Sequence, residues 1–544
     1  MNLSSSKQTI GHRAGSRLIP WLCLLAAIGW SILLRVPLVV NAPVHLDSDL
    51  AVDGLTLQEA LDGHWRWHYP GTPYTGTGAV LLSWIPARIW GANPQTLVSG
   101  GTVAHLILLV GVFALVWRVF GQASAIGSLV PLTFASTGLL WLSGRITGGH
   151  LLIVAWSGWA WLLLYEWLTR LGWKRSIALG VWCGLGIYLD SMFALTLGGI
   201  VIAGLLAARR FRGRDLVHVL ILIAAFLAGA APRVIGRWVE PHDAYHEQFS
   251  WSLDSRLLAD HSRILFLECL PRLVAGHRLP GLEADPDPAL LGTGGPIQHG
   301  SSSREGAKWW VWPLVVLALS SWAAAFLALV RVVWESTEAA CRAVAVGLLA
   351  TALAELAGFL INRNIFNSDN YRYLVLLLIP WSAGCGLVVG HAIRRVGKRR
   401  WAVLAATMAL AALYTCDAAA WYRHLGWIDE SFRLVQRRVD DPAVAWLRKH
   451  PEIQTIFGSY WDVYRLSFLS GRKLKGVPLP IFPNRFPEWS AGLPGGRPET
   501  LLVRRAPEDL HFLNSALREG GKVLHRERGL LIVHWPWRGP GRTL

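Results

Sequence analysis

Repeated apolar segments are the feature that most constrains the fold of this chain. Of its 544 residues, 53% are hydrophobic and only 16% are charged. Eleven segments approach the roughly 20 apolar residues that a helix needs to cross a bilayer. We predict spans at 18–40, 98–117, 124–142, 150–168, 176–190, 193–208, 215–231, 308–330, 341–361, 373–393 and 401–420. The stretch from Ala79 to Trp90 is too short to span and predicts an interfacial helix under the first loop.

This pattern favours a helical bundle over a membrane barrel. Backbone groups in lipid must be hydrogen-bonded within the protein, which only helices and closed barrels achieve. The sequence contains no runs of about ten residues with the alternating hydrophobicity of membrane strands. The predicted fold class is an all-α polytopic membrane bundle of about 11 transmembrane helices with a small C-terminal α/β domain.

The apolar segments stop near residue 425, where shorter mixed elements begin. We divide the chain into a transmembrane module, 1–425, and a C-terminal α/β domain, 426–544. In that domain we predict an amphipathic helix through Ala443 and Trp446, strands at 455–457, 501–503 and 530–533, and a helix opened by Pro507. The turn-rich stretch 281–305 predicts a linker between helices.

Basic residues in the short loops set the orientation, because Lys and Arg are enriched in cytoplasmic loops. With eleven helices, 18 of them fall on one side: Lys7, Arg13, Arg17, Arg118, Arg170, Lys174, Arg175, Arg209, Arg210, Arg212, Arg214, Arg331, Arg342, Arg394, Arg395, Lys398, Arg399 and Arg400. The other side receives the first external loop 41–97, residues 143–149, the long external loop 232–307, residues 362–372 and the C-terminal domain. We therefore predict a multi-pass protein of the inner or plasma membrane, with a cytoplasmic N-terminus and an extracytoplasmic C-terminal domain.

The net charge of +17 does not call for nucleic acid as a partner, since those basic residues lie at helix ends facing anionic headgroups. The six cysteines include no CxxC pair, so no disulfide framework is expected. The first apolar segment lacks a small-residue cleavage site and is interpreted as a retained anchor.

An acidic cluster, His45-Leu46-Asp47-Ser48-Asp49, follows the first predicted span directly. Ionisable groups placed at a membrane bundle favour a functional role. The alternative is that these acids are simply solvated, or that they cap a helix from Leu50 to Leu61. Their predicted position, on the same side as the C-terminal domain, favours chemistry.

Five short stretches of polar and aromatic residues are informative when they are considered together: Leu46–Gly54, Tyr69–Gly76, Gly148–His150, Asn370–Leu374 and Tyr460–Arg465. Together they resemble the GT-C superfamily of glycosyltransferases. The most similar type is the polyprenyl-phosphate-sugar enzymes related to protein mannosyltransferases (glycosyltransferase family 39) and to lipid A aminoarabinose transferase. The chain differs from that pattern at Leu50, where Glu is common, and at His150, where Tyr is common. These differences leave the choice of substrate open.

The resemblance implies an inverting glycosyltransferase that takes a sugar from an undecaprenyl- or dolichyl-phosphate carrier. The acceptor, an unknown glycan, lipid or protein, would lie on the non-cytoplasmic face. Asp49 matches the catalytic Asp of the family and is our candidate base. Asp47 is its substitute, or a like-charged partner that raises its proton affinity.

Transfer also needs a cation to hold the departing phosphate. Arg372, at the external start of a predicted helix, is our candidate because a guanidinium can bind two phosphate oxygens; an arginine that reaches to lipid headgroups is the alternative. Arg145, in the second external loop, is a reserve on the same reasoning. The further substrate-binding candidates are Tyr371, His150, Tyr74 and Asp190. Aromatic residues such as Tyr74 also mark the ordinary interfacial belt.

Metal binding is a secondary hypothesis. The proposed chemistry requires no cofactor, but Asp47 and Asp49 have the spacing to coordinate Mg²⁺ or Mn²⁺. His242 and His246 lack an identifiable third zinc ligand, and we predict no zinc site there.

Two other functions stay open. A transporter or lipid flippase would also place ionisable groups in a helical bundle, although no inverted repeat is visible in the sequence. A catalytically inactive GT-C-like scaffold is the second, because of Leu50. Within the spans, Glu355 and Arg35 predict a structural ion pair.

Overall fold

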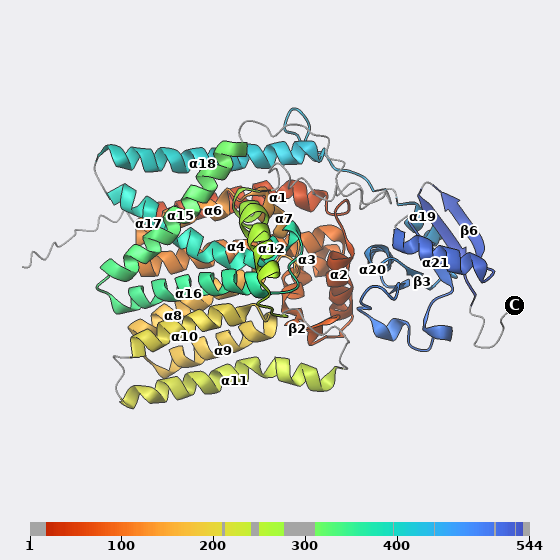
Figure 1. Cartoon of the computed structure of the whole chain (residues 1–544), viewed down its shortest axis with the longest axis horizontal. Coiled ribbons are helices and arrows are strands. Elements are labelled where there is room, and N and C mark those ends of the chain that lie inside the picture. The colour runs from red at the N-terminus through yellow and green to blue at the C-terminus, as the bar shows by residue number, and fades with distance from the viewer. Residues whose placement is uncertain are drawn as a thin grey trace, which may run out of the picture.

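The structure is a computed structural model that describes residues 18–208, 213–240, 250–276, 311–394, 397–439, 441–504, 507–527 and 529–536. A helical bundle carries a small α/β domain at one end (Figure 1). The predicted fold class is therefore confirmed. The predicted linker 281–305, together with His242 and His246, lies outside the described residues.

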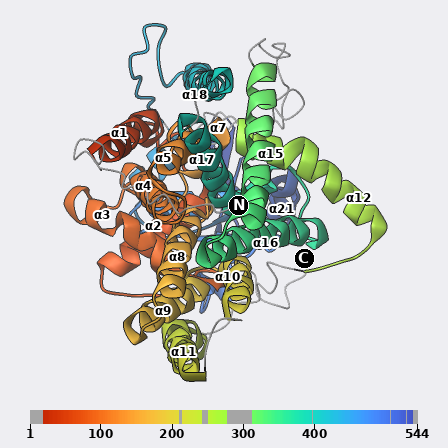
Figure 2. The same ribbon diagram turned by 90° about the vertical axis from the view of Figure 1, so that its left-hand side faces the viewer.

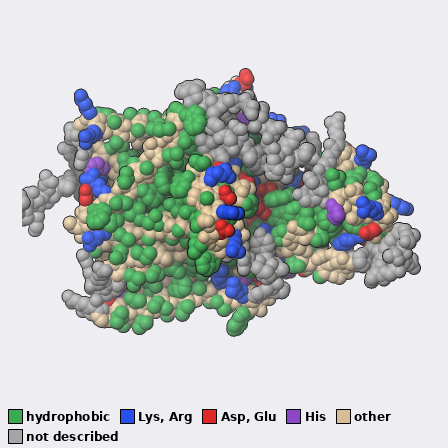
Figure 3. Space-filling view, in the orientation of Figure 1, with side chains coloured by type: hydrophobic (Ala, Val, Ile, Leu, Met, Phe, Trp, Pro, Cys, Tyr) green, Lys and Arg blue, Asp and Glu red, His purple; other side chains and the backbone are tan. Residues whose placement is uncertain are grey.

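Eight helical segments in the described part of the chain are long and apolar enough to cross a membrane. They are α1 (Leu18–Val40), α4 (Pro94–Phe120), α8 (Leu151–Thr169), α11 (Leu216–Val239), α15 (Val311–Glu335), α16 (Ala339–Ile361), the segment Ser368–Arg394 and α18 (Lys398–His424). The segment Ser368–Arg394 comprises a 3₁₀ helix, η5 (Ser368–Leu377), and α17 (Leu378–Arg394). The visible flank of the bundle is mostly hydrophobic, with Lys and Arg gathered towards its two ends (Figure 3).

The predicted count of eleven spans is not confirmed. Two of the remaining segments form shorter helices, α9 (Trp173–Leu189) and α10 (Phe193–Ala208), with 17 and 16 residues. The segment 124–142 is broken into α5 (Gln122–Ser128), α6 (Val130–Thr133) and α7 (Thr137–Leu142). Pro131 lies in the first turn of α6 and supplies no N–H to extend α5. Ser136 then accepts the Leu139 N–H at 3.1 Å and starts α7.

The first loop is ordered, at the end of the bundle next to the α/β domain (Figure 1). It contains α2 (Ser48–Leu61), a two-stranded antiparallel sheet of β1 (His68–Tyr69) and β2 (Thr72–Gly76), a 3₁₀ helix η2 (Thr77–Ser83) and α3 (Trp84–Trp90). The last two elements match the short helix predicted at 79–90. A 3₁₀ turn η3 (Gly213–Asp215) precedes α11.

A second group of short helices precedes α15 in the chain: α12 (Ser255–Arg263), a π-helix η4 (Ile264–Cys269) and α13 (Leu270–Ala275). Figure 2 shows α12 on the outside of the bundle, beyond α15 and α16. The segment is tied to the end of α16, because the Ser252 N–H donates to the Ile361 carbonyl at 2.8 Å and the Arg363 N–H to the Ser250 carbonyl at 2.6 Å.

The C-terminal domain is an α/β sheet domain, as predicted. Its elements are α19 (Pro442–Lys449), β3 (Thr455–Gly458), α20 (Tyr460–Leu469), β4 (Lys475–Pro478), η6 (Pro487–Trp489), η7 (Pro494–Gly496), β5 (Thr500–Val503), α21 (Pro507–Arg518), β6 (Lys522–Glu527) and β7 (Leu530–His534). The strand order is β4-β3-β5-β7-β6. β3 is parallel to both β4 and β5, whereas β7 is antiparallel to β5 and β6.

The ion pair expected between Arg35 and Glu355 is wrong. Arg35 Nε donates to Ser143 Oγ at 2.9 Å, and Nη1 donates to the Ser31 carbonyl at 2.9 Å. Glu355 Oε1 accepts the Leu376 N–H at 2.9 Å instead. Each side chain is therefore hydrogen-bonded to a nearby polar group of the bundle, as ionisable residues within membrane spans usually are.

Candidate active site

Asp47 is the N-cap of α2. Its Oδ1 accepts the Leu50 N–H at 2.9 Å, and its Oδ2 accepts a hydrogen bond from Arg145 Nη1 in a largely buried ion pair. The Arg145 guanidinium also lies 4.5 Å from the centre of the Trp141 ring. The capping alternative from the sequence is therefore correct for Asp47. Its charge is compensated by Arg145.

Asp49 lies in the first turn of α2 and has the more open carboxylate, with 36% of its side chain exposed. The Tyr460 hydroxyl donates to Asp49 Oδ1 at 2.6 Å, and Arg485 Nη2 lies 4.0 Å from the same oxygen. The Tyr69 hydroxyl donates to the Asp49 carbonyl at 3.1 Å. Of the two predicted acids, Asp49 is thus the more accessible to solvent.

Asp53 is a third acid, one turn further along α2, that sequence reasoning did not single out. Its side chain is buried; Oδ1 accepts the Thr147 hydroxyl at 2.5 Å and Oδ2 the Thr147 N–H at 3.3 Å. Burial raises the pKa of the Asp53 carboxyl to about 7; the Thr147 hydrogen bonds oppose this, and the negative charge of Asp49 adds to it. The four-residue spacing from Asp49 on a helix is the sequence signal that indicates this neighbour.

We expect the stability of this region to fall with rising pH because of Asp53. Its folded-state pKa of about 7 lies above the ordinary value of 3.8, so the stability that the neutral carboxyl contributes is present at low pH and lost as the pH rises through about 7. The difference in Tm between Asp53→Asn and wild type should therefore become more positive from about pH 5 to about pH 8.5. Asp260→Asn, at an exposed position of α12, is the control. A difference for Asp53→Asn that stays constant over this range would contradict the assignment.

His150, Asp190 and Tyr74 belong to neighbouring loops. His150, in a left-handed backbone conformation with a φ of 51°, precedes α8, and its Nδ1 is hydrogen-bonded to Asp190 Oδ2 at 2.8 Å. Asp190 ends α9 and forms a β-bridge with Thr75. The Tyr74 carbonyl accepts the Ser191 N–H at 3.2 Å. The structure therefore brings these three predicted residues together.

Arg372 lies in η5. Its Nη2 donates to the Tyr373 hydroxyl at 3.4 Å, its guanidinium lies 5.2 Å from the Tyr373 ring centre, and its buried Nε has no hydrogen-bond partner among the described residues. The Tyr373 ring in turn lies 5.7 Å from the His150 ring. Arg372 and Tyr373 thus lie next to His150.

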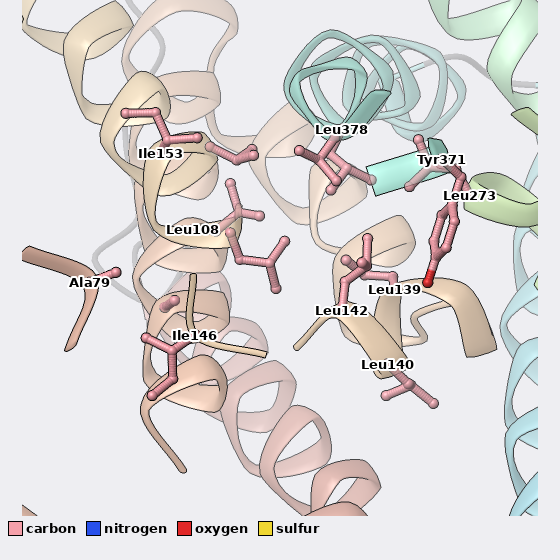
Figure 4. Packing of buried hydrophobic residues seen from close by; sticks show 14 of the residues in the cluster. Ala79, Leu108, Leu139, Leu140, Leu142, Ile146, Ile153, Leu273, Tyr371 and Leu378 are labelled. Atoms are coloured by element: carbon pink, nitrogen blue, oxygen red, sulfur yellow. The ribbon is translucent and has the colours of Figure 1, made fainter. Parts of the chain in front are cut away.

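Tyr371, the neighbour of Arg372, points into the core instead. Its side chain is buried, its hydroxyl donates to the Gly138 carbonyl at 3.2 Å, and the Arg272 guanidinium lies 5.2 Å from its ring centre. Figure 4 shows it beside Leu273, with the hydroxyl directed towards α7. The contacts described for Tyr371 therefore anchor η5.

Two residues of the C-terminal domain, Tyr460 and Arg485, complete the surroundings of Asp49. Tyr460 opens a stretch that the sequence resemblance included, but without a role for its hydroxyl. Arg485, in the loop after β4, carries no sequence signal that sets it apart from other arginines. Their proximity to Asp49 follows from how the domain docks.

The donor set is a poor fit for a divalent metal ion. The oxygens of Asp47 already accept hydrogen bonds from Arg145 and from the Leu50 N–H, and a guanidinium beside a carboxylate opposes the binding of a second cation. No group of three or more His, Cys, Asp or Glu side chains arranged for a metal occurs in the described part of the chain.

No protein-family model and no curated protein sequence matches this chain. Several solved structures are similar to it. ArnT from Cupriavidus metallidurans bound to undecaprenyl phosphate is 13% identical, with a TM-score of 0.56 over 97% of this chain and 100% of that chain. The same enzyme in the apo state has a TM-score of 0.53 at 13% identity, over 95% and 100%. The Archaeoglobus fulgidus oligosaccharyltransferase, in complex with Zn and sulfate, has a TM-score of 0.45 at 13% identity, over 88% and 67%.

The similarity to ArnT extends over nearly the whole chain, including both the helical bundle and the C-terminal domain. At this identity it establishes the architecture. The chain therefore shares the fold of ArnT.

Proposed function

We propose that this protein is an integral-membrane, inverting glycosyltransferase that moves a sugar from a polyprenyl-phosphate carrier to an acceptor on the non-cytoplasmic face. The observation that carries the proposal is the partly exposed Asp49 carboxylate, held by the Tyr460 hydroxyl at 2.6 Å with Arg485 Nη2 at 4.0 Å from the same oxygen. The shared fold supports a polyprenyl-phosphate-linked donor, because the crystal structure of ArnT holds undecaprenyl phosphate.

In the proposed reaction Asp49 takes the proton of an acceptor hydroxyl while the hydroxyl oxygen bonds to the anomeric carbon of the donor. The bond from that carbon to the phosphate oxygen breaks, and the polyprenyl phosphate leaves with the electron pair. Attack opposite the phosphate inverts the anomeric configuration. A positioned base contributes about 10²- to 10⁴-fold to such a reaction.

Arg372 is the proposed ligand of the departing phosphate. Its unpartnered Nε–H offers a donor, and charge-assisted hydrogen bonds to phosphate oxygens stabilise the charge that develops as the bond breaks. The 2.8 Å hydrogen bond between His150 and Asp190 holds the start of α8 against the end of α9, next to Arg372 and Tyr373. Arg145 and Tyr371 support the site indirectly, by holding Asp47 and η5.

The test is sugar transfer by the purified protein in detergent, with synthetic polyprenyl-phosphate donors that differ in the sugar. We expect release of polyprenyl phosphate that depends on an acceptor, and a product with the opposite anomeric configuration by NMR. A transporter or flippase would instead move labelled lipid between the leaflets of vesicles without cleaving the donor. An inactive scaffold would do neither.

Topology provides a second test. Reporter fusions after Arg214 and Arg400 should read cytoplasmic, because these residues belong to the basic loops. Fusions after Gly294 and at the C-terminal Leu544 should read extracytoplasmic, on the side where the lipid-linked donor would be used. A cytoplasmic C-terminus would overturn the proposed location of the reaction.

A further inference from the structure

We propose that the C-terminal domain is a fixed part of the active site, in which Tyr460 and Arg485 are positioning residues for Asp49. The inference rests on the proposed function of Asp49 as the base and adds a role for the domain beyond it. It is carried by the contacts between α2 and the C-terminal domain.

Tyr460 follows the carboxyl end of β3, whose parallel neighbours β4 and β5 lie on opposite sides. Open α/β sheets commonly bind ligands at this kind of position. Tyr460 is buried, with 4% of the residue exposed, and its hydroxyl donates to Asp49 Oδ1 at 2.6 Å. Ser48 Oγ donates to the Tyr460 carbonyl at 2.5 Å and fixes the start of α20 against α2.

Arg485 strengthens the same arrangement. Its Nε donates to the Tyr460 hydroxyl at 3.2 Å and its Nη1 to the Pro70 carbonyl at 3.2 Å. Its charge lies 4.0 Å from Asp49 Oδ1. Gly71 makes room for it: a Cβ there would lie 2.6 Å from Arg485 Cδ, and the φ of 69° also disfavours other residues. The first external loop and the C-terminal domain thus pack closely around the Arg485 side chain.

The domain is docked along the whole length of α2. A Cβ on Gly54 would lie 2.5 Å from the Phe468 ring, so the two helices touch closely. Towards the end of α2, Arg472 of the C-terminal domain pairs with Glu59 at 3.4 Å and with Asp62 at 3.0 Å. These contacts hold the domain against α2 in the position from which Tyr460 reaches Asp49.

The consequence for Asp49 is geometric. Tyr460 and Arg485 act on Oδ1, and the described residues leave Oδ2 for the acceptor hydroxyl. The domain thus fixes the orientation of the proposed base.

The experiment measures kcat and the KM for the donor in Tyr460→Phe, Arg485→Gln and Arg485→Lys. Losing a contact that orients the base should lower kcat about tenfold, because a misplaced base acts only on the reacting step. The KM for the donor and the Tm should change little. Arg485→Lys keeps the charge and should recover part of the effect.

Arg497→Gln is the matched control in the same domain, because its guanidinium stacks on Trp535, 3.6 Å from the ring centre, away from Asp49. Its kcat should follow wild type. Wild-type kcat in both Tyr460→Phe and Arg485→Gln, or a loss of kcat that only accompanies a lower Tm, would overturn the inference. If Tyr460→Phe does not fold, the comparison of Arg485→Gln with Arg485→Lys decides. Absence of transfer by wild type would instead refute the proposed function itself.

Discussion

Asp49→Asn is expected to lower the turnover of sugar transfer by about 100-fold or more while donor binding changes little. Asparagine keeps the size of the side chain and can still accept the Tyr460 hydroxyl bond through its amide oxygen. It cannot take the proton of the acceptor. Since the loss is confined to the reacting step, kcat should fall and the affinity for the donor should remain.

Asp47→Asn is the matched control on the same helix. Asparagine is also a good N-cap, so α2 should still form, but the ion pair with Arg145 is lost. Turnover should fall by about tenfold or less, together with a lower Tm. The measurement is transfer from a synthetic polyprenyl-phosphate donor in detergent beside a binding assay for that donor. An active Asp49→Asn with a dead Asp47→Asn would move the base two residues upstream.

The sequence predicted the bundle well because lipid imposes one strong rule, that about 20 apolar residues form a spanning helix. The rule fails where a segment is buried by other helices instead of lipid. Residues 124–142 are apolar enough for a span, yet Pro131 and Ser136 divide them into short helices packed inside the bundle. Composition does not distinguish these two cases.

The site was predicted in part. The family resemblance favoured Asp49 as the base over Asp47, and the structure adds that Arg145 neutralises Asp47 while the Asp49 carboxylate is more open. Tyr460 lies more than 400 residues from Asp49 along the chain, and a contact at that separation depends on how two domains dock. The Arg35–Glu355 prediction failed for a related reason, since opposite charges in two spans do not reveal which helix faces they occupy.

Arg372→Ala is expected to lower kcat/KM for the donor by about 100-fold, because the departing phosphate loses a charge-assisted donor. Arg372→Lys should recover part of this loss, to within about tenfold of wild type, since lysine keeps the charge but lacks the planar fork. The fold should survive both changes. η5 is held by Tyr371 and by the Asn367–Asn370 capping box, and the Arg372 side chain makes its described hydrogen bond only to Tyr373.

Tyr373→Phe separates the two functions of this position. It removes the hydroxyl that accepts the Arg372 bond but leaves the ring over which the guanidinium lies, so donor use should fall far less than in Arg372→Ala. Donor affinity and turnover are measured for all three variants with the same polyprenyl-phosphate sugar. Wild-type turnover in purified Arg372→Ala would remove this residue from the mechanism. A defect as large in Tyr373→Phe would mean that the arginine needs its tyrosine partner to reach the phosphate, since the charge alone would then be insufficient.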